Sequence, residues 1–448
     1  MNEARAPQSD RPLKLIALAV AVVVPAIAWL LSGVIGPRGQ AAAGAICFIS
    51  ICAVCSTNLR AVNWRTVGWG LAIQLGLAIF ILRFEVGGVR PGYQFFSAIA
   101  NVVRQFLEFT NAGSYFVFGA LANQTVLGEA LGPAHGFVFA FAALPTIIFI
   151  SSFFTVLYYF GVLQVIVWAM ARVMMYALRT SGAETLSSAA NVFMGQTEAP
   201  IIVKPYVPAM TRSELLALMV GGMATISGGV MAVYIALGAD PIAILTTSVM
   251  AAPCGLYLSK LLLPETEQPA TQGAIALTVE RRHANAIDAA AAGATDGLTL
   301  ALNVAAMLIA FLAFIALLDA LLGWLWGGLT LAQVFSFVFA PVAFLMGVPA
   351  ADIPAVADLL GTKLVANEFV AFVKLTGEYR DVLGERSQIL ATYALTGFAN
   401  LSSVGIQLGG IGAMAPSRRG DLAALGMRAL LGGFLATLIN ACMASMLL

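Results

Sequence analysis

The segment ANVFMGQTEAP (Ala190–Pro200) decides how the chain folds. It places an amide, a hydroxyl and a carboxylate side by side at Gln196, Thr197 and Glu198, and the stretches on both sides of it are apolar. Three consecutive side chains cannot share one face of a helix, but they converge at a hairpin tip whose backbone is unwound. We therefore predict a re-entrant hairpin over 181–208 with a polar tip inside a membrane, a solvent loop being the alternative.

The composition of the 448-residue chain indicates a membrane protein. Hydrophobic residues make up 60% of it and charged residues 10%, with a mean hydropathy of +0.92, whereas soluble domains carry about 25% charged residues. The net charge of +1 excludes the concentrated basic face of a nucleic-acid binder. Because the apolar runs are long and continuous, they favour helices over the alternating segments of a barrel. We predict an all-α polytopic membrane protein with an interfacial helix, two re-entrant hairpins and about nine transmembrane helices.

Hydropathy divides the chain into units. Most of the 23 lysines and arginines fall in segments placed in the cytoplasm, so the N-terminus is expected inside and the C-terminus outside, in the periplasm. The nine crossings are expected at 15–34, 41–57, 66–84, 137–165, 214–237, 241–263, 297–321, 388–413 and 422–446. The expected units are a cytoplasmic N-terminus (1–14), an additional N-terminal transmembrane helix (15–34), scaffold helices (35–165) with an interfacial helix (93–108), a first transport-domain repeat (181–263), a cytoplasmic linker (264–296), a scaffold helix (297–321) and a second transport-domain repeat (333–448).

The polar pattern of the hairpin tip recurs further along the chain. GGMATISGGV (Gly221–Val230) interrupts the next apolar span with glycines and hydroxyls, although close helix packing would also explain its glycines. VANEFVAF (Val365–Phe372) places Glu368 in a second apolar hairpin, expected within 333–373, and TGFANLSSVGIQLGG (Thr396–Gly410) interrupts another span. Paired blocks with broken helices are typical of an inverted-repeat transporter whose site lies at the membrane midplane.

The residue types limit the ligand. Carboxylates beside amides and hydroxyls suit an uncharged polyhydroxylated solute, while hydroxyl and carbonyl oxygens at a helix break suit a hard cation. The sequence has no nucleophile–base constellation and no metal-ligand spacing of His or Cys near these segments, so we expect no enzymatic activity and no organic cofactor.

At these segments the chain resembles the concentrative nucleoside transporter family, in its bacterial sodium-coupled form. The resemblance spans about residue 40 to the C-terminus and rests on LPTIIFISSFFTVLYYFGVLQ (Leu144–Gln164), ANVFMGQTEAPIIVKPYVPAMTRSEL (Ala190–Leu215), GGMATISGGV, NEFVAF and GFANLSSVGIQLGGIGAMAPSRRGDLAALG. It implies a homotrimeric symporter in the bacterial inner membrane that imports nucleosides such as uridine, adenosine and cytidine with Na⁺, by an elevator-type movement. Proton coupling is the alternative.

The resemblance also implies roles for individual residues. The nucleobase would be bound by Gly195, Gln196, Thr197, Glu198, Val230 and Phe398. The ribose would be bound by Glu368, Asn400 and Ser403. Sodium would be bound by Asn191 and Thr225 through their side chains and by Met194 and Ile226 through their backbone carbonyls.

Overall fold

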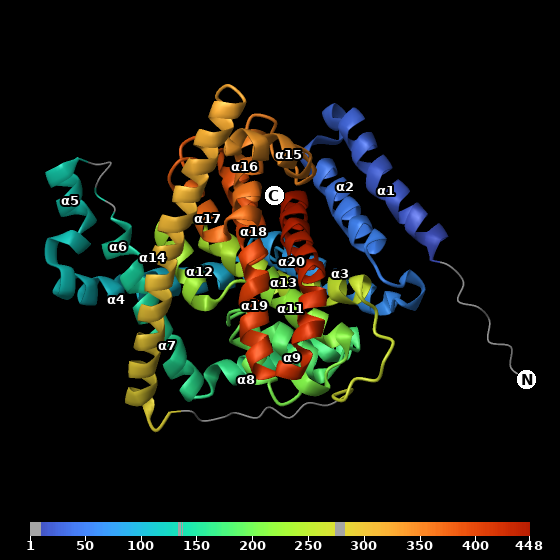
Figure 1. Ribbon diagram of the computed structural model, residues 1–448, viewed down its shortest axis with the longest axis horizontal. Coiled ribbons are helices and arrows are strands. Elements are labelled where there is room, and N and C mark those ends of the chain that lie inside the picture. Colours follow the sequence, from blue (N-terminus) through green and yellow to red (C-terminus); the bar gives the residue numbers. More distant parts are fainter. Residues whose placement is uncertain (1–9, 133–135, 137, 274–282) are drawn as a thin grey trace, which may run out of the picture.

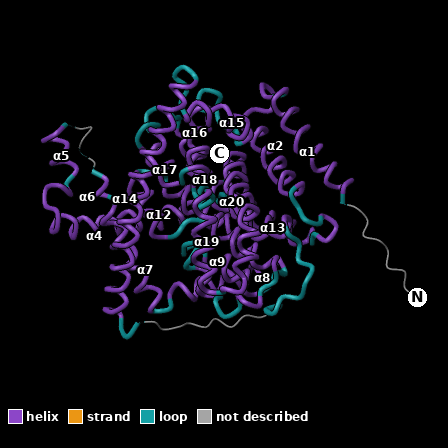
Figure 2. Tube along the Cα trace, viewed as in Figure 1, coloured by secondary structure: helices purple, strands orange, loops and turns teal. Residues whose placement is uncertain are grey.

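The computed structural model describes residues 10–132, 136, 138–273 and 283–448 and contains helices joined by short loops (Figures 1 and 2). Within these residues there is no strand, only an isolated bridge between Val86 and Val89. Eight helical segments of this part of the chain are long and apolar enough to cross a membrane. The all-α polytopic fold expected from the sequence is thereby confirmed.

Four long helices open the chain: α1 (Arg11–Leu30), α2 (Ser32–Val54), α3 (Trp64–Leu82) and α4 (Pro91–Phe118). Helix α1 packs along α2, and α2 in turn packs against the last helix of the chain. Helix α4 is longer than the interfacial helix expected at 93–108, and with its neighbour α5 it extends away from the centre, on the left of Figure 1.

The next helices are α5 (Gln124–Leu131), α6 (Phe139–Ala142), α7 (Leu144–Tyr159) and α8 (Val162–Leu178). The crossing expected at 137–165 is therefore divided, because Gly161 adopts a left-handed conformation with a φ of 79°. Helix α8 was not predicted as a separate element. The apolar run of α7 continues past Gly161 into the first residues of α8, so hydropathy alone did not separate the two.

The first half of the central region consists of α9 (Gly182–Ala190), α10 (Ala199–Ile202), α11 (Arg212–Ala224), α12 (Gly228–Leu237) and α13 (Pro241–Leu262). Helices α9 and α10 are the two arms of a hairpin, and α11 and α12 are two parts of one broken span. In the most apolar part of this span 94% of the residues are buried, whereas in α14 (Ala286–Leu325) only 6% are. The broken span therefore lies at the centre of the molecule and α14 at its periphery.

Helix α14 packs along α7 at the positions of two glycines. A Cβ atom at Gly297 would lie 2.7 Å from Ile148 Cα, and one at Gly293 would lie 2.5 Å from Thr155 Oγ1. The linker expected at 264–296 is shorter than predicted, since α14 already begins at Ala286. The first turns of α14 are rich in alanine. Alanine contributes little to a hydropathy signal for a membrane span, but it has the highest helix propensity.

The second half of the central region repeats the order hairpin, broken span, unbroken helix. Its helices are α15 (Leu331–Leu345), α16 (Ile353–Val365), α17 (Glu368–Thr376), α18 (Glu385–Leu395), α19 (Leu401–Met414) and α20 (Arg419–Leu447). The hairpin proper is α16–α17, and α15, which the expected hairpin range 333–373 had included, is a separate helix packed against α16. The crossing expected at 388–413 is broken between α18 and α19.

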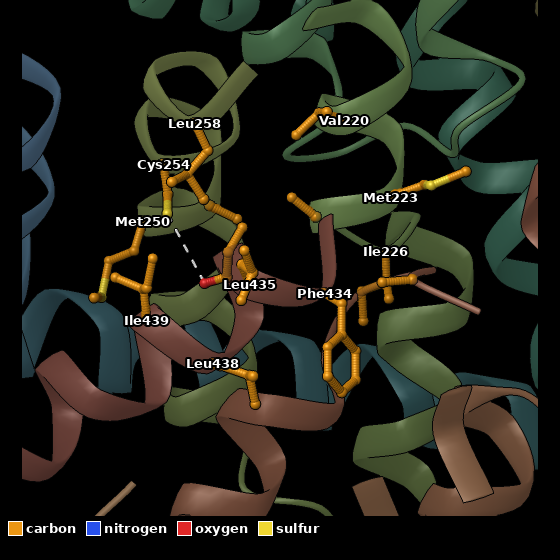
Figure 3. Close-up of a cluster of buried hydrophobic side chains, with 14 of the residues drawn as sticks. Val220, Met223, Ile226, Met250, Cys254, Leu258, Phe434, Leu435, Leu438 and Ile439 are labelled. Atoms are coloured by element: carbon orange, nitrogen blue, oxygen red, sulfur yellow. Dashed lines mark hydrogen bonds between the residues drawn. The ribbon is translucent and has the colours of Figure 1, made fainter. Parts of the chain in front are cut away.

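Helices α11, α13 and α20 form the core that holds the two halves together. Figure 3 shows Val220 and Met223 of α11, Cys254 of α13 and Leu435 of α20 among the apolar side chains that fill this contact. A Cβ atom at Gly433 would lie 2.5 Å from Met223 Cβ, so α20 approaches α11 closely enough to exclude a larger residue. This packing brings the break of α11–α12 and the break of α18–α19 to the same level.

Candidate functional site

The tip of the first hairpin is a short loop between α9 and α10. Glu198 accepts a hydrogen bond at Oε2 from the backbone N–H of Gly195, 3.0 Å away, which closes the loop on itself. Gln196 points out of the loop, and its Nε2 donates to Ser403 Oγ of α19 over 3.1 Å. Thr197 also faces α19, because a Cβ atom at Gly410 would lie 2.7 Å from its Cγ2. Gln196 and Thr197 therefore point toward the second half of the chain, whereas Glu198 folds back onto the tip.

The first break separates α11 from α12 and contacts this hairpin. Thr225 is extended, with φ −125° and ψ 174°, and its hydroxyl donates to Gly221 O over 3.0 Å. Ser227 caps α12 by accepting from Val230 N. The N–H of Gly228 donates to Phe193 O of the hairpin over 2.9 Å, so tip and break are joined through their main chains.

The two breaks meet each other directly. The N–H of Phe398, released by the break between α18 and α19, donates to Thr225 O over 3.1 Å. A Cβ atom at Gly397 would lie 3.0 Å from Met223 O and 2.6 Å from Thr437 Cγ2. Glycine is required at this position because the backbones of the two broken spans approach so closely.

Glu368, the first residue of α17, is the centre of a hydrogen-bond network. Its Oε2 accepts from Asn400 Nδ2 over 2.7 Å, and its Oε1 accepts from Tyr234 O–H over 3.2 Å. Asn400 also caps α19, since its Oδ1 accepts from Ser403 N over 2.9 Å and from the Ser402 hydroxyl over 2.7 Å. The residues predicted to bind a ribose are thus joined in one buried cluster.

Tyr234 belongs to this cluster and was not predicted. Its ring stacks on Phe372, with centroids 4.0 Å apart, and its hydroxyl reaches the Glu368 carboxylate. The signal in the sequence is its spacing, because Tyr234 lies four residues after Val230 and therefore on the same helical face of α12.

Gln407 of α19 is a second residue that sequence reasoning missed. Its Nε2 donates to Met219 O over 3.0 Å, while its Oε1 and that of Gln196 are buried without a partner in the described part of the chain. Both side chains crowd Gly222, where a Cβ atom would lie 2.9 Å from each. Two buried carbonyl oxygens are therefore available for donors on a ligand.

Asn191, at the end of α9, is fully buried, and neither its Oδ1 nor its Nδ2 has a hydrogen-bond partner among the described residues. It faces the first break, since a Cβ atom at Gly221 would lie 3.1 Å from its Nδ2. Met194 and Ile226 lie in the non-helical segments of the tip and of the break. An unpartnered amide oxygen beside non-helical carbonyls suits a hard cation such as Na⁺.

No group of three or more His, Cys, Asp or Glu residues in the described ranges is arranged to hold a metal ion. The first hairpin tip and the first break contain amide, hydroxyl and backbone oxygens, at Asn191, Thr225 and Ile226. They suit an alkali ion rather than a transition metal.

A cavity of about 220 Å³ lies beside the first hairpin tip. It is lined by Met194 and Glu198 of the tip, Ser227 of the break, Phe154 of α7 and Asp296 of α14. The like charges of Asp296 and Glu198 interact across it. Glu368 is not among its lining residues, so in this conformation the cavity reaches the first hairpin and stops short of the second.

Three family models match this chain. Family models described as "Na+ dependent nucleoside transporter" N-terminus and C-terminus match residues 43–121 and 243–445, and one described as "Nucleoside recognition" matches residues 140–241. The chain is 42% identical to the Sodium/nucleoside cotransporter 1 of Mus musculus, over 96% of its own length and 67% of the relative's.

Solved structures of a protein named CNTnw are similar as well. One is in an inward-facing, substrate-bound state; it is 38% identical, has a TM-score of 0.85, and the match covers 91% of this chain and 97% of CNTnw. A variant of CNTnw in an outward-facing state is 37% identical with the same TM-score, covering 92% and 97%.

Proposed function

Because the chain belongs to the sodium-dependent nucleoside transporter family, we propose that it is a symporter that imports nucleosides together with sodium ions. The family consists of transporters and not of enzymes. The observation that carries the proposal is the meeting of the two helix breaks, where Glu368, Asn400 and Ser403 are linked to the first hairpin through Gln196.

The nucleoside binds between the two hairpin tips. Glu368 and Asn400 offer a carboxylate and an amide to the vicinal hydroxyls of a ribose, and the Ser403 hydroxyl, which now accepts from Gln196, turns to the same sugar. Gln196, Thr197 and Glu198, next to Gly195, hydrogen-bond the edge of the base. Val230 and Phe398 pack against its faces. Uridine, adenosine and cytidine all present such an edge and a ribose.

Sodium binds between the first hairpin and the first break, at Asn191 Oδ1, Thr225 Oγ1 and the carbonyls of Met194 and Ile226. The supporting observation is the buried, unpartnered amide of Asn191. Because the Thr225 hydroxyl now donates to Gly221 O, its oxygen lone pairs remain available to an ion. A sodium ion at this position orders the backbone of the hairpin tip that binds the base, so the nucleoside binds more tightly. By thermodynamic linkage the nucleoside raises the affinity for sodium by the same factor.

Transport follows an elevator-type alternating access. The mobile unit comprises 181–263 and 333–448, and it moves against a scaffold of 35–165 and 297–321. In support, CNTnw has been solved in inward-facing and outward-facing states, and the cavity at Glu198 lies between this unit and α7 and α14. Each sodium ion that enters contributes about 2.3 kcal/mol per 100 mV of membrane potential.

The protein assembles as a homotrimer in the bacterial inner membrane, with its N-terminus cytoplasmic and its C-terminus periplasmic. The excess of Lys and Arg in the segments assigned to the cytoplasm supports this orientation.

The test is uptake of radiolabelled uridine, and in parallel adenosine, by proteoliposomes containing the full chain. Three conditions are compared: an inward sodium gradient, a matched inward proton gradient, and no gradient. Accumulation above equilibrium with sodium alone supports the proposal. Accumulation with protons alone replaces sodium by proton coupling through Glu198 or Glu368, and no uptake of either nucleoside refutes the proposed substrate.

A further inference from the structure

Lys363 of α16 is a completely buried lysine on the inner side of the second hairpin. Its Nζ donates to Ala394 O over 2.7 Å and to Thr437 Oγ1 over 3.0 Å, and it lies 5.6 Å from the centre of the Phe434 ring. Among the described residues no carboxylate lies within ion-pair distance of it, in contrast to Lys374 of the same hairpin, which pairs with Asp358. The ammonium group is therefore held by a carbonyl, a hydroxyl and a ring face, all of which are uncharged.

Ala394 O is an oxygen that the second helix break leaves free. In a continuous helix it would accept from the N–H of Phe398, but that N–H donates to Thr225 O of the first half instead. It also lies in the last turn of α18, where the aligned peptide dipoles concentrate negative potential. A cation at this position satisfies the oxygen and the helix end together.

The corresponding place in the first half has no positively charged side chain. There the end of α9 faces the last turn of α11 before the first break, and the residue present is Asn191, whose buried amide has no partner. Each half thus has a hairpin arm facing the end of a broken helix. In one half a lysine fills the contact, and in the other an unpartnered oxygen remains.

We propose that the ammonium group of Lys363 is a tethered cation, which takes at the second break the place that a sodium ion takes at the first. The second hairpin is thereby held to α18 and α20 without a mobile ion, and only the first half exchanges its cation during transport. The ammonium group of Lys363 also lies close to the proposed ribose site, because it interacts electrostatically with the Glu368 carboxylate across the tip of the second hairpin. The comparison with sodium rests on the proposed function, whereas the cation site at Ala394 and Thr437 does not.

The test replaces the tethered cation by a free one in the purified full-length protein. Lys363→Ala removes the side chain beyond Cβ and leaves a space for propylammonium, which restores the missing carbons and the charge. The melting temperature is measured against propylammonium chloride up to 100 mM, with choline chloride at equal concentration as the salt control. We expect propylammonium to raise the melting temperature of Lys363→Ala by about 5 °C and to leave the wild type unchanged.

Two further variants separate charge from packing. Lys363→Arg keeps a cation and should retain most of the wild-type melting temperature, whereas Lys363→Met fills a similar volume without charge and should melt at least about 5 °C lower than Lys363→Arg. If Lys363→Met is as stable as the wild type, or if Lys363→Ala fails to respond to propylammonium or stays unfolded in its presence, the tethered cation is refuted. Because this measurement needs neither nucleoside nor a gradient, its failure is distinguishable from failure of the symporter proposal.

A transport readout tests the comparison with sodium itself. In proteoliposomes, uridine uptake by the wild type should depend on sodium with a Hill coefficient near 1, and in Lys363→Ala the vacated site should admit a second ion and raise it toward about 2. A purely structural lysine predicts a lower rate with an unchanged Hill coefficient, and that result would refute the equivalence of the two sites.

Discussion

The two hairpin units of the centre share an order of elements but differ in how their polar atoms are satisfied. In the second unit Glu368 has two donors and Lys363 has two acceptors, so these two buried charged groups are held by side chains and one backbone carbonyl of the protein. In the first unit Asn191 and Gln196 keep buried oxygens without partners in the described part of the chain. Unsatisfied buried oxygens cost about 1–3 kcal/mol each. The second unit has one open oxygen of this kind near the site, Gln407 Oε1. The two units therefore differ at the hairpin arm: the first keeps the Asn191 amide open for a ligand, whereas the second fills the corresponding contact with Lys363.

The largest effect should come from Glu368→Gln, which removes the charge at the centre of the hydrogen-bond network of the second unit. The carboxylate accepts from Asn400 and Tyr234, and an amide presents an N–H₂ group to one of these donors. With hydrogen bonds to a charged group contributing about 1.5–3 kcal/mol each, we expect a loss of roughly 100-fold in uridine affinity at saturating sodium, measured by calorimetry. Glu378→Gln, an exposed glutamate after the same hairpin, is the matched control. Uridine affinity unchanged in Glu368→Gln would remove Glu368 from the site.

In the first unit, Asn191→Ala should change the response to sodium rather than the affinity for uridine. Loss of one oxygen ligand should raise the sodium concentration for half-maximal uridine uptake about tenfold, while uridine affinity at saturating sodium falls little. Sodium titration of uptake in proteoliposomes measures this, with Asn111→Ala on the exposed face of α4 as control. An unchanged sodium dependence would show that the ion binds elsewhere and would end the contrast between the two units.

A smaller effect is expected from Tyr234→Phe, which sharpens the comparison at the contact between the units. The change deletes the hydroxyl that donates to Glu368 but keeps the ring stacked on Phe372. Loss of one hydrogen bond of about 1 kcal/mol should weaken uridine binding about fivefold, with no change in the sodium response. The exposed Tyr176 of α8 provides the control variant Tyr176→Phe. A change in the sodium concentration for half-maximal uptake would instead show that Tyr234 couples sodium binding in the first unit to uridine binding in the second.

Local chemistry made several features predictable. A polar run followed by Pro200 inside an apolar stretch implies a hairpin tip, and glycines, hydroxyls and amides inside apolar spans imply breaks, which the structure has at 225–227 and 396–400. Glu368, Asn400 and Ser403 were assigned together from the resemblance, and they are hydrogen-bonded together in the fold. These features depend on residues near one another in the chain.

Hydropathy was less informative about helix boundaries. Helix α8 follows α7 after a single turn at Gly161, and α15 is joined to the second hairpin by the short loop 346–352. In both places the chain changes direction within a stretch that is mostly apolar. Average hydropathy does not depend on the direction of the chain, so the expected ranges 137–165 and 333–373 each included a turn between two helices.

Long apolar runs and the polar or helix-breaking residues inside them were enough to predict a helical membrane protein with two polar hairpin tips and two broken spans, because each of these features is encoded within a short segment of the chain. Which atoms meet is visible only in the folded chain: Gln196 with Ser403, Phe398 with Thr225, Tyr234 with Glu368, and Lys363 with Ala394 and Thr437. These pairs join segments far apart in the chain, and their geometry is set by the close packing of α11, α13 and α20. Membrane helices satisfy their own backbone, so the oxygens left over at the breaks find their partners only when both halves are packed together.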